Sequence, residues 1–361
     1  MNCISARHNS RARALSAIAL IGSSALVVSG CATDTQPAEE SGSTTNEVTI
    51  VVHDSFIDGA EFEAAASEAT GYDVKVITSG DGGELTNKLV LTKGAPIADA
   101  FFGVDNTFAS RLVENDVVAE VEPEGLPARA AAHQLDALVP SDIGATCVNI
   151  DTGWFAEKNI AEPVTYEDLT KPEYRDLTVL LDPTSSSTGA SFMIGTIEAF
   201  GEDGFADYWK QLVDNGATVS QGWNEAYYEK FTAASESGTQ PIVVSYSTSP
   251  AFTVNDDETE STTKALLDTC TTQVEYAGVL AGAANPEGAK ALVEYMLSEE
   301  FQSIIPDEMY MYPIDESVAL PATWETFAPL PAADKVHDLT PAEIESGREG
   351  WLKALAEAIG L

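Results

Sequence analysis

Basic residues are scarce in this sequence. Lys and Arg together number 18 against 58 Asp and Glu, so the formal net charge at pH 7 is −40. A surface of this charge repels nucleic acids and anionic membranes, and its field attracts cations. The simpler explanation for most of these carboxylates is solubility in a salty or crowded exterior. We therefore expect no nucleic-acid partner.

Histidine and cysteine are equally rare, with four of each. Outside the first 30 residues, the histidines stand far apart at His53, His133 and His337. No Cys-x-x-Cys or Cys/His cluster occurs, so no metal site is predicted. We also find no GxSxG, HExxH, Walker or EF-hand pattern. The sequence predicts a protein that is not an enzyme, with no catalytic residue, no metal and no cofactor.

The first 30 residues have the parts of a secretory signal. Three arginines precede an apolar stretch over 14–28, which is followed by Ser29-Gly30-Cys31. This segment resembles a bacterial lipoprotein signal, in which Cys31 is lipidated and becomes the mature N-terminus. The alternative is a plain signal peptide with an incidental cysteine. A transmembrane helix is not expected, because about 15 apolar residues are too few to span a bilayer. We predict an exported protein, tethered by lipid to the extracytoplasmic face of the cell membrane.

Two cysteines remain for the exported chain, because Cys3 leaves with the signal and Cys31 is the predicted anchor. Cys147 and Cys270 are an even pair in an oxidising compartment, which favours a disulfide between them. Each is expected to begin a strand.

Strand and helix patterns alternate after residue 46. Residues 32–46 lack large apolar groups and predict a flexible spacer. Strands are predicted from β-branched or continuous apolar runs at 48–52, 74–77, 98–104, 179–181 and 242–246. Helices are predicted at about 84–91, from the Thr165 capping box, through 192–200, after the Asn285 cap and after the Thr340 cap. This alternation predicts an α/β fold with mostly parallel sheets.

In parallel sheets, ligands bind at the loops that leave the strand ends. The loop after Ile77 contains three glycines and Asp81, a combination that suits a polar ligand but also occurs in ordinary turns. The loop after Leu181 places five hydroxyl residues before a helix, where a phosphate or carboxylate is favoured. Either loop could instead be a polar turn without a ligand.

Aromatic residues accompany the other two candidate loops. Trp223, Tyr227 and Tyr228 follow a turn glycine, while Tyr246 and Phe252 flank three hydroxyl residues and a proline. Rings presented from loops with hydroxyls between them suit a flat ligand held by stacking and a few polar contacts. Each ring taken alone is more often part of a core.

These stretches resemble the thiamine-binding components of bacterial ABC importers. The resemblance covers nearly the whole exported chain, and the stretches that carry it are 53–56, Asp81-Gly82 with Asn87, 103–106, Asp182-Pro183 with the loop that follows, 222–227, 245–252 and 311–313. Several of these recur in iron- and polyamine-binding relatives.

The resemblance implies a two-lobed clamshell, with each lobe a mostly parallel sheet flanked by helices and the ligand in the cleft. The expected divisions are a lipoprotein signal (1–30), a linker (31–46), the first part of lobe 1 (47–145), lobe 2 with hinge strands at its edges (146–270), and a hinge return with the C-terminal helices of lobe 1 (271–361). In this fold, the strands of Cys147 and Cys270 would run side by side where the lobes meet.

The resemblance also assigns thiamine contacts to this chain. They fall on Asp81, Gly82, Ser186, Ser187, Trp223, Tyr246, Ser247, Thr248 and Ser249. Asp105 and Tyr227 complete the expected site, together with His53 and Tyr310, where the family commonly has Tyr and Trp. The expected ligand is thiamine or its mono- or diphosphate, the expected partner is an ABC permease, and the expected state is a monomer.

Three alternatives remain open from the sequence. A polyamine receptor would need several carboxylates along an extended ligand, whereas Asp81, Asp105 and Glu225 are the acids near the aromatic loops. A ferric-ion receptor would need His and carboxylate ligands beside its tyrosines. A tethered hydrolase would need a nucleophile or paired carboxylates.

Overall fold

The computed structural model describes residues 46–121 and 126–361. The predicted signal (1–30), the lipidation site Cys31 and all but the last residue of the linker (31–46) lie outside the described residues. The described residues form one compact unit. The structure therefore bears on the predicted α/β part of the chain.

Nine strands of the described residues form one mixed sheet. Their order is β2 (Asp73–Thr78), β1 (Glu47–Val52), β3 (Ala100–Asp105), β8 (Thr263–Val279), β4 (Val139–Asp151), β7 (Ile242–Tyr246), β5 (Thr178–Leu181) and β6 (Thr218–Ser220), with β9 (Tyr312–Pro313) paired to β4.

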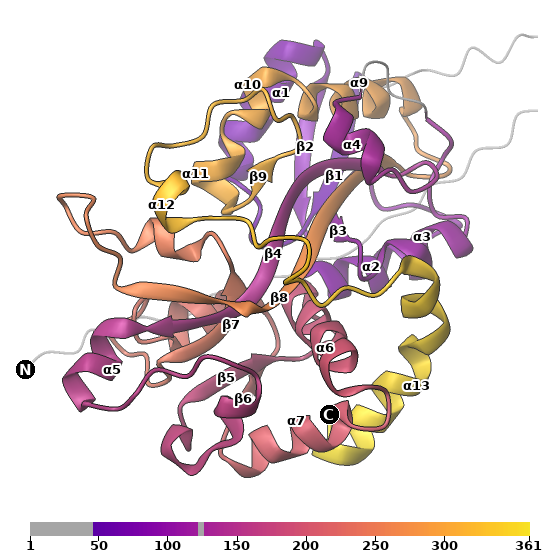
Figure 1. The fold of residues 1–361 in the computed structure, drawn as a ribbon. Helices are drawn as coiled ribbons and strands as arrows, with labels where there is room; N and C mark the ends of the chain where they lie inside the picture. Colours follow the sequence, from indigo (N-terminus) through magenta and orange to yellow (C-terminus); the bar gives the residue numbers. More distant parts are fainter. Residues whose placement is uncertain (1–45, 122–125) are drawn as a thin grey trace, which may run out of the picture. The chain divides into compact units, whose positions relative to one another are not determined.

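The sheet has two parallel halves joined by two long antiparallel strands. In the first half β1 pairs in parallel with β2 and β3, and in the second β5 pairs in parallel with β6 and β7. Between them, β8 runs antiparallel to β3 and β4, and β4 antiparallel to β7. Figure 1 shows β4 and β8 running from one half to the other. The α/β prediction is confirmed, but the centre of the sheet is antiparallel because the chain crosses between the halves along these strands.

Helices cover both halves of the sheet. The α-helices are α1 (Gly59–Thr70), α2 (Gly82–Leu91), α3 (Ala109–Glu114), α4 (Ala128–Ala132), α5 (Thr152–Lys158), α6 (Ser187–Phe200), α7 (Phe205–Asp214), α8 (Trp223–Glu225), α9 (Pro286–Met296), α10 (Glu299–Gln302), α11 (Ile305–Met309), α12 (Trp324–Phe327) and α13 (Pro341–Ile359). Short 3-10 turns are η1 (Glu167–Thr170), η2 (Pro172–Tyr174) and η4 (Ser249–Phe252), and η3 (Ala226–Lys230) is a π-helical turn.

Two predicted helix caps are present and one is not. The Asn285 side chain accepts the Gly288 N–H at the start of α9, and Thr340 forms a reciprocal capping box at the start of α13. At Thr165 the prediction of a helix is wrong, because only the 3-10 turn η1 forms there. Lys171 precedes a proline and takes extended backbone angles, which ends the turn.

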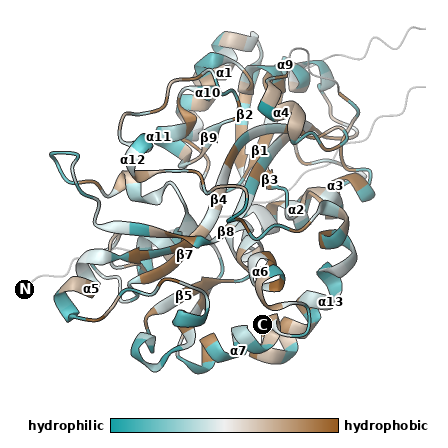
Figure 2. Cartoon of the chain, in the orientation of Figure 1, coloured by the Kyte–Doolittle hydropathy of each residue, from teal (hydrophilic) through white to brown (hydrophobic). Residues whose placement is uncertain are grey.

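Buried side chains form separate clusters on the two halves of the sheet. One cluster of buried side chains packs α6, α7 and the C-terminal part of α13 on β5 and β7, and another packs α1 and α9 on β1 and β3. Figure 2 shows hydrophobic residues concentrated in strands such as β5 and β7, while hydrophilic residues occupy outer faces of the helices. Burial of these faces supplies most of the favourable free energy of folding.

A disulfide joins Cys147 of β4 to Cys270 of β8. Both cysteines lie in the interior of their strands, so the expectation that each begins a strand is wrong. The earlier parts of both strands carry polar residues such as Asp142 and Thr269, which are buried in the structure and hide the strand pattern in the sequence. The expected lobe boundaries at 145/146 and 270/271 fall inside these two strands.

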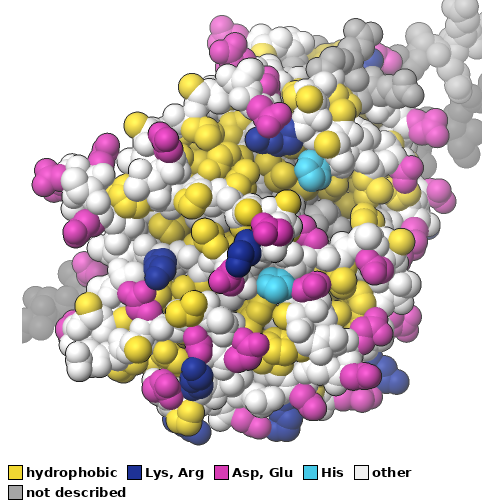
Figure 3. Space-filling model, viewed as in Figure 1, with side chains coloured by type: hydrophobic (Ala, Val, Ile, Leu, Met, Phe, Trp, Pro, Cys, Tyr) yellow, Lys and Arg dark blue, Asp and Glu magenta, His cyan; other side chains and the backbone are white. Residues whose placement is uncertain are grey.

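Acidic side chains are scattered over the face of the molecule in Figure 3, with few Lys or Arg among them.

Among residues 46–121 and 126–361, none of the helices combines the length and apolar character needed to cross a bilayer.

Candidate functional site

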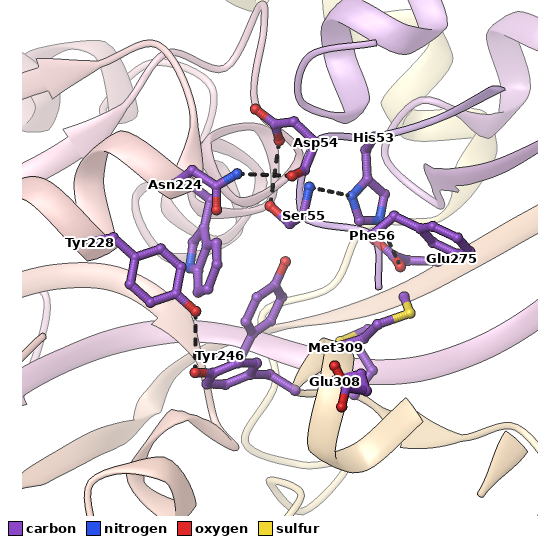
Figure 4. A pocket seen from close by; sticks show the side chains of 13 residues that line it. His53, Asp54, Ser55, Phe56, Asn224, Tyr228, Tyr246, Glu275, Glu308 and Met309 are labelled. Atoms are coloured by element: carbon purple, nitrogen blue, oxygen red, sulfur yellow. Dashed lines mark hydrogen bonds and ion pairs between the residues drawn. The ribbon is translucent and has the colours of Figure 1, made fainter. Parts of the chain in front are cut away.

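A cavity of about 210 Å³ opens where the first and second halves of the sheet face each other. Figure 4 shows Asn224 and Tyr228 on one side of it and His53 with Glu275 on the other. Its lining comes from the loop after β1, the α8–η3 segment, the end of β7, the interior of β8 and the region around α11: His53, Asp54, Ser55, Phe56, Trp223, Asn224, Tyr228, Tyr246, Glu275, Glu308, Met309, Tyr310 and Met311.

Trp223 is the centre of an aromatic cluster on one wall. Its ring stacks on Tyr227 with centroids 4.8 Å apart and meets Tyr228 edge-on at 5.2 Å. Its indole N–H donates to Ser245 Oγ at 2.9 Å. Trp223 is only 4 % exposed, so both its orientation and its environment are determined by the protein. Such a ring offers a preset face to a flat or cationic ligand.

Tyr310 extends this aromatic wall from α11. Its ring stacks on Phe252 with centroids 3.6 Å apart, and its hydroxyl lies 3.2 Å from that of Tyr228. Tyr310 has a left-handed backbone (φ 62°), and Thr248 Oγ1 donates to its carbonyl oxygen. Tyr310, one of the predicted contacts, therefore lines the cavity.

His53 lies opposite the aromatic wall and is 8 % exposed. Its Nδ1 accepts the Ser55 N–H at 3.1 Å, and its Nε2 lies 3.5 Å from Oε2 of Glu275. Burial lowers the pKa of His53, but Glu275 and two further carboxylates raise it by more, so the net shift is upward. Gly103 makes room for the ring, because a Cβ there would lie 1.9 Å from the imidazole Cδ2.

Glu275 is the middle member of a buried row of three carboxyl groups. In the sheet it is directly opposite Asp105 of β3 and Asp142 of β4. Burial raises the pKa of Asp105 to about 7. Burial and the adjacent Glu275 raise the pKa of Asp142 well above its ordinary value. Like charges this close cannot all ionise in a buried site, so the two aspartates tend to hold protons near neutral pH.

Asp81 lies between the two halves rather than on the cavity wall. One carboxylate oxygen accepts the N–H groups of Gly82 and Ser187, and the other accepts the Trp223 N–H at 3.0 Å. Gly82 is needed here, because a Cβ would lie 2.1 Å from Ser187 Oγ. This carboxylate thereby links α2 of the first half to α6 and α8 of the second.

The remaining predicted contacts do not line the cavity. Ser186 caps α6, and the Ser187 hydroxyl is buried without a hydrogen-bonding partner among the described residues. Ser249 Oγ bonds Ser245 Oγ, while Ser247 and Thr248 are fully buried. Tyr227 and Asp105 lie behind Trp223 and Glu275. Of the predicted residues, His53, Trp223, Tyr246 and Tyr310 line the cavity.

Sequence reasoning missed several lining residues. The loop after β1 supplies Asp54, Ser55 and Phe56, which follow the predicted contact His53 in a stretch that carries the resemblance but were not expected to contact the ligand. Glu275 had a usable signal, because a charged residue stands inside the apolar run of β8. Glu308, Met309 and Met311 flank the predicted contact Tyr310 and are not themselves among the expected contacts, although 311–313 is one of the stretches that carry the resemblance. No group of three or more metal-ligating side chains suited to a metal ion occurs within 46–121 and 126–361.

The chain is similar to known bacterial solute-binding proteins. A profile described as bacterial extracellular solute-binding protein matches residues 95–338. A thiamine-binding periplasmic protein of Escherichia coli K12 is 27 % identical over 323 residues, which cover 86 % of this chain and 93 % of that protein. One from Brucella abortus is 28 % identical and covers 85 % and 90 % of the two chains.

Solved structures show the same fold. A periplasmic thiamin binding protein superposes with a TM-score of 0.76 and 25 % identity, covering 87 % of this chain and 96 % of that one. The iron-bound HitA from Pseudomonas aeruginosa superposes with a TM-score of 0.67 at 18 % identity, covering 87 % and 99 %. The second comparison supports the fold alone.

Proposed function

The chain belongs to the bacterial extracellular solute-binding protein family, and from this premise we propose that it captures thiamine for an ABC importer. The observation that carries the proposal is the cavity itself, where an aromatic wall around Trp223 faces the carboxylate of Glu275. The relatives named for thiamine binding, which match along most of both chains, support the choice of this ligand.

The chemistry of the cavity suits a flat cation. Thiamine carries a permanently charged thiazolium ring and a second aromatic ring. A cation over Trp223 or a neighbouring tyrosine gains about 0.5–2 kcal/mol for each good contact. Nanomolar affinity requires about 12 kcal/mol, so ring burial and closure of the two halves must supply most of it.

The family places this protein outside the cytoplasm. We further propose that lipidated Cys31 tethers it to the membrane and that residues 32–46 let it reach the permease as a monomer. The site is for binding and not for catalysis. Incubation with thiamine phosphates should release no inorganic phosphate, whereas released phosphate would indicate a hydrolase.

One ligand panel tests the proposed function. Protein stripped of ligand by unfolding and refolding is titrated calorimetrically with thiamine, its mono- and diphosphate, spermidine and ferric citrate. We expect tight binding of thiamine or one of its phosphates and no binding of spermidine or ferric citrate. Absence of binding by all three thiamine compounds would contradict the proposal.

Spermidine is the rival that the structure makes worth testing. Three carboxylates line the cavity, Asp54, Glu275 and Glu308, which is more acid than the sequence alone indicated. A polyamine needs such carboxylates spaced along an extended chain, whereas here the wall that faces Glu275 consists of the rings of Trp223, Tyr228 and Tyr310. Binding of spermidine in preference to thiamine would therefore replace the proposed ligand.

A further inference from the structure

Glu275 is a deeply buried acidic residue on the wall of the cavity. It lies in β8, one of the two long strands that join the halves, and is 3 % exposed. It nevertheless lines the cavity, and Figure 4 shows its carboxylate beside His53 and across from Tyr228. A charge buried this deeply is costly unless a partner of opposite charge compensates it.

The partners that the protein itself gives to Glu275 are incomplete. Gln273 Nε2 donates to its Oε1 at 3.4 Å, a long hydrogen bond. His53 Nε2 lies 3.5 Å from Oε2 and has no other hydrogen-bonding partner among the described residues. No Lys or Arg lines this cavity in the part of the chain that the structure describes. Glu275 therefore lacks a permanent counter-charge within the protein.

The neighbouring carboxyls restrict the charge of the site. Asp105 and Asp142 are directly opposite Glu275 on the adjacent strands, so their side chains share one face of the sheet with it. Asp105 accepts two hydrogen bonds from Thr107 through one oxygen, and its other oxygen has no hydrogen-bonding partner in the described chain. Mutual repulsion keeps the row from carrying three charges. Of the three carboxyl groups, Glu275 is the one that lines the cavity.

We propose that Glu275 is the counter-ion of the bound ligand and selects a solute with a single positive charge at its ring over a neutral solute of the same shape. The inference rests on the proposed function, since thiamine is such a solute. It adds a specificity-determining residue that is absent from the expected contacts. A low local dielectric makes this pairing stronger than an exposed one.

The test compares thiamine with a neutral isostere in which carbon replaces the thiazolium nitrogen. Both compounds are titrated calorimetrically into wild-type protein, Glu275→Gln and Glu308→Gln. Glu308 is the matched control, because it lines the same cavity but is exposed to water, where its charge is screened. Wild-type protein should prefer thiamine to the isostere at least tenfold.

Glu275→Gln should lose at least tenfold in affinity for thiamine and less than threefold for the isostere. Glu308→Gln should keep the wild-type preference. Equal loss for both compounds in Glu275→Gln would assign Glu275 a structural role and overturn the inference, as would no loss for thiamine. Wild-type protein that binds neither compound would instead overturn the proposed function and this inference with it.

Wild-type protein supplies a second measurement in case Glu275→Gln fails to fold. His53 faces Glu275, Asp54 and Asp81, and Glu275 also faces Asp105, Asp142 and Tyr246. Protonation of His53 gives Glu275 a positively charged partner as pH falls, and protonation of Asp105 removes a further negative charge from the site. The preference for thiamine over the isostere should therefore fall at least threefold between pH 8 and pH 5.5. A constant preference over this range would contradict the inference.

Discussion

Individual side chains at the cavity contribute separately to ligand affinity, and we expect Trp223 to contribute most. It is held by a stacked Tyr227 on one side and a hydrogen bond to Ser245 on the other. Trp223→Ala removes the ring and should weaken thiamine binding at least tenfold by calorimetry. Trp223→Phe keeps a ring face and should lose less. Trp154→Ala, which changes a tryptophan outside the cavity, serves as the control, and unchanged affinity in Trp223→Ala would remove this residue from the site.

Asp105 should make the stability of the protein depend on pH. Its pKa is raised to about 7 in the folded protein by burial, against an ordinary value of 3.8. The folded state thus holds a proton that the unfolded state releases, so Asp105 increasingly opposes folding as pH rises from about 4 to about 7. Above pH 7 the penalty is constant, at most about 4 kcal/mol for about three pKa units.

Asp105→Asn keeps an oxygen to accept both hydrogen bonds from Thr107 and removes the charge. We expect the variant to have a higher free energy of unfolding than wild type at pH 8, and this advantage to vanish by pH 4. Urea unfolding of ligand-free protein at the two pH values measures it. The titration of His53 affects both proteins and largely cancels. An equal difference at both pH values would show that the charge of Asp105 is not responsible.

At the scale of elements, three helix starts meet on one carboxylate. Asp81 caps α2 and also accepts N–H groups from Ser187 of α6 and from Trp223 of α8. The sequence predicts Asp81 as a ligand contact, and the structure adds a role in holding the two halves together. The close approach of α2 to Ser187 depends on Gly82, which leaves no room for a side chain.

Asp81→Ala should therefore favour a more open arrangement of the halves. We expect a larger radius of gyration for the ligand-free variant in small-angle X-ray scattering and weaker thiamine binding. Asp58→Ala is the matched control, because Asp58 caps α1 and, among the described residues, makes no bond to the second half. If both variants scatter like wild type, the carboxylate of Asp81 does not hold the halves together.

At the scale of the whole molecule, stability depends on the two strands that connect the halves. The disulfide between Cys147 and Cys270 crosses β4 and β8 and closes a loop with a sequence separation of 123. Closing so long a loop restricts the unfolded chain and is worth about 2–5 kcal/mol.

Replacing both cysteines by serine should lower the free energy of unfolding by this amount in urea. Reductant should destabilise the wild-type protein similarly and leave the double variant unaffected. Mass spectrometry of the untreated protein should find no free thiol at either position. Two free thiols there, or a reductant effect that persists in the variant, would exclude a stabilising disulfide.

The elements with strong local signals could be predicted from the sequence. The β-branched run of β1, the Asn285 cap of α9 and the capping box of α13 each depend on residues close together in the chain. The 3-10 turn at Thr165 was missed because Pro172, beyond the apparent cap, ends it. The long strands β4 and β8 were recognised only in part, because buried polar residues interrupt their apolar pattern.

The sequence by itself determined the α/β class, the acidic surface and the aromatic loops around Trp223 and Tyr246, since composition and short patterns suffice for these. Only the tertiary structure decided that the central strands are antiparallel, that Asp81 links the halves, and that Glu275 faces the same cavity as His53 and Tyr310. Each of these depends on which distant segments come together, and strand pairing across more than a hundred residues leaves no local trace in the sequence.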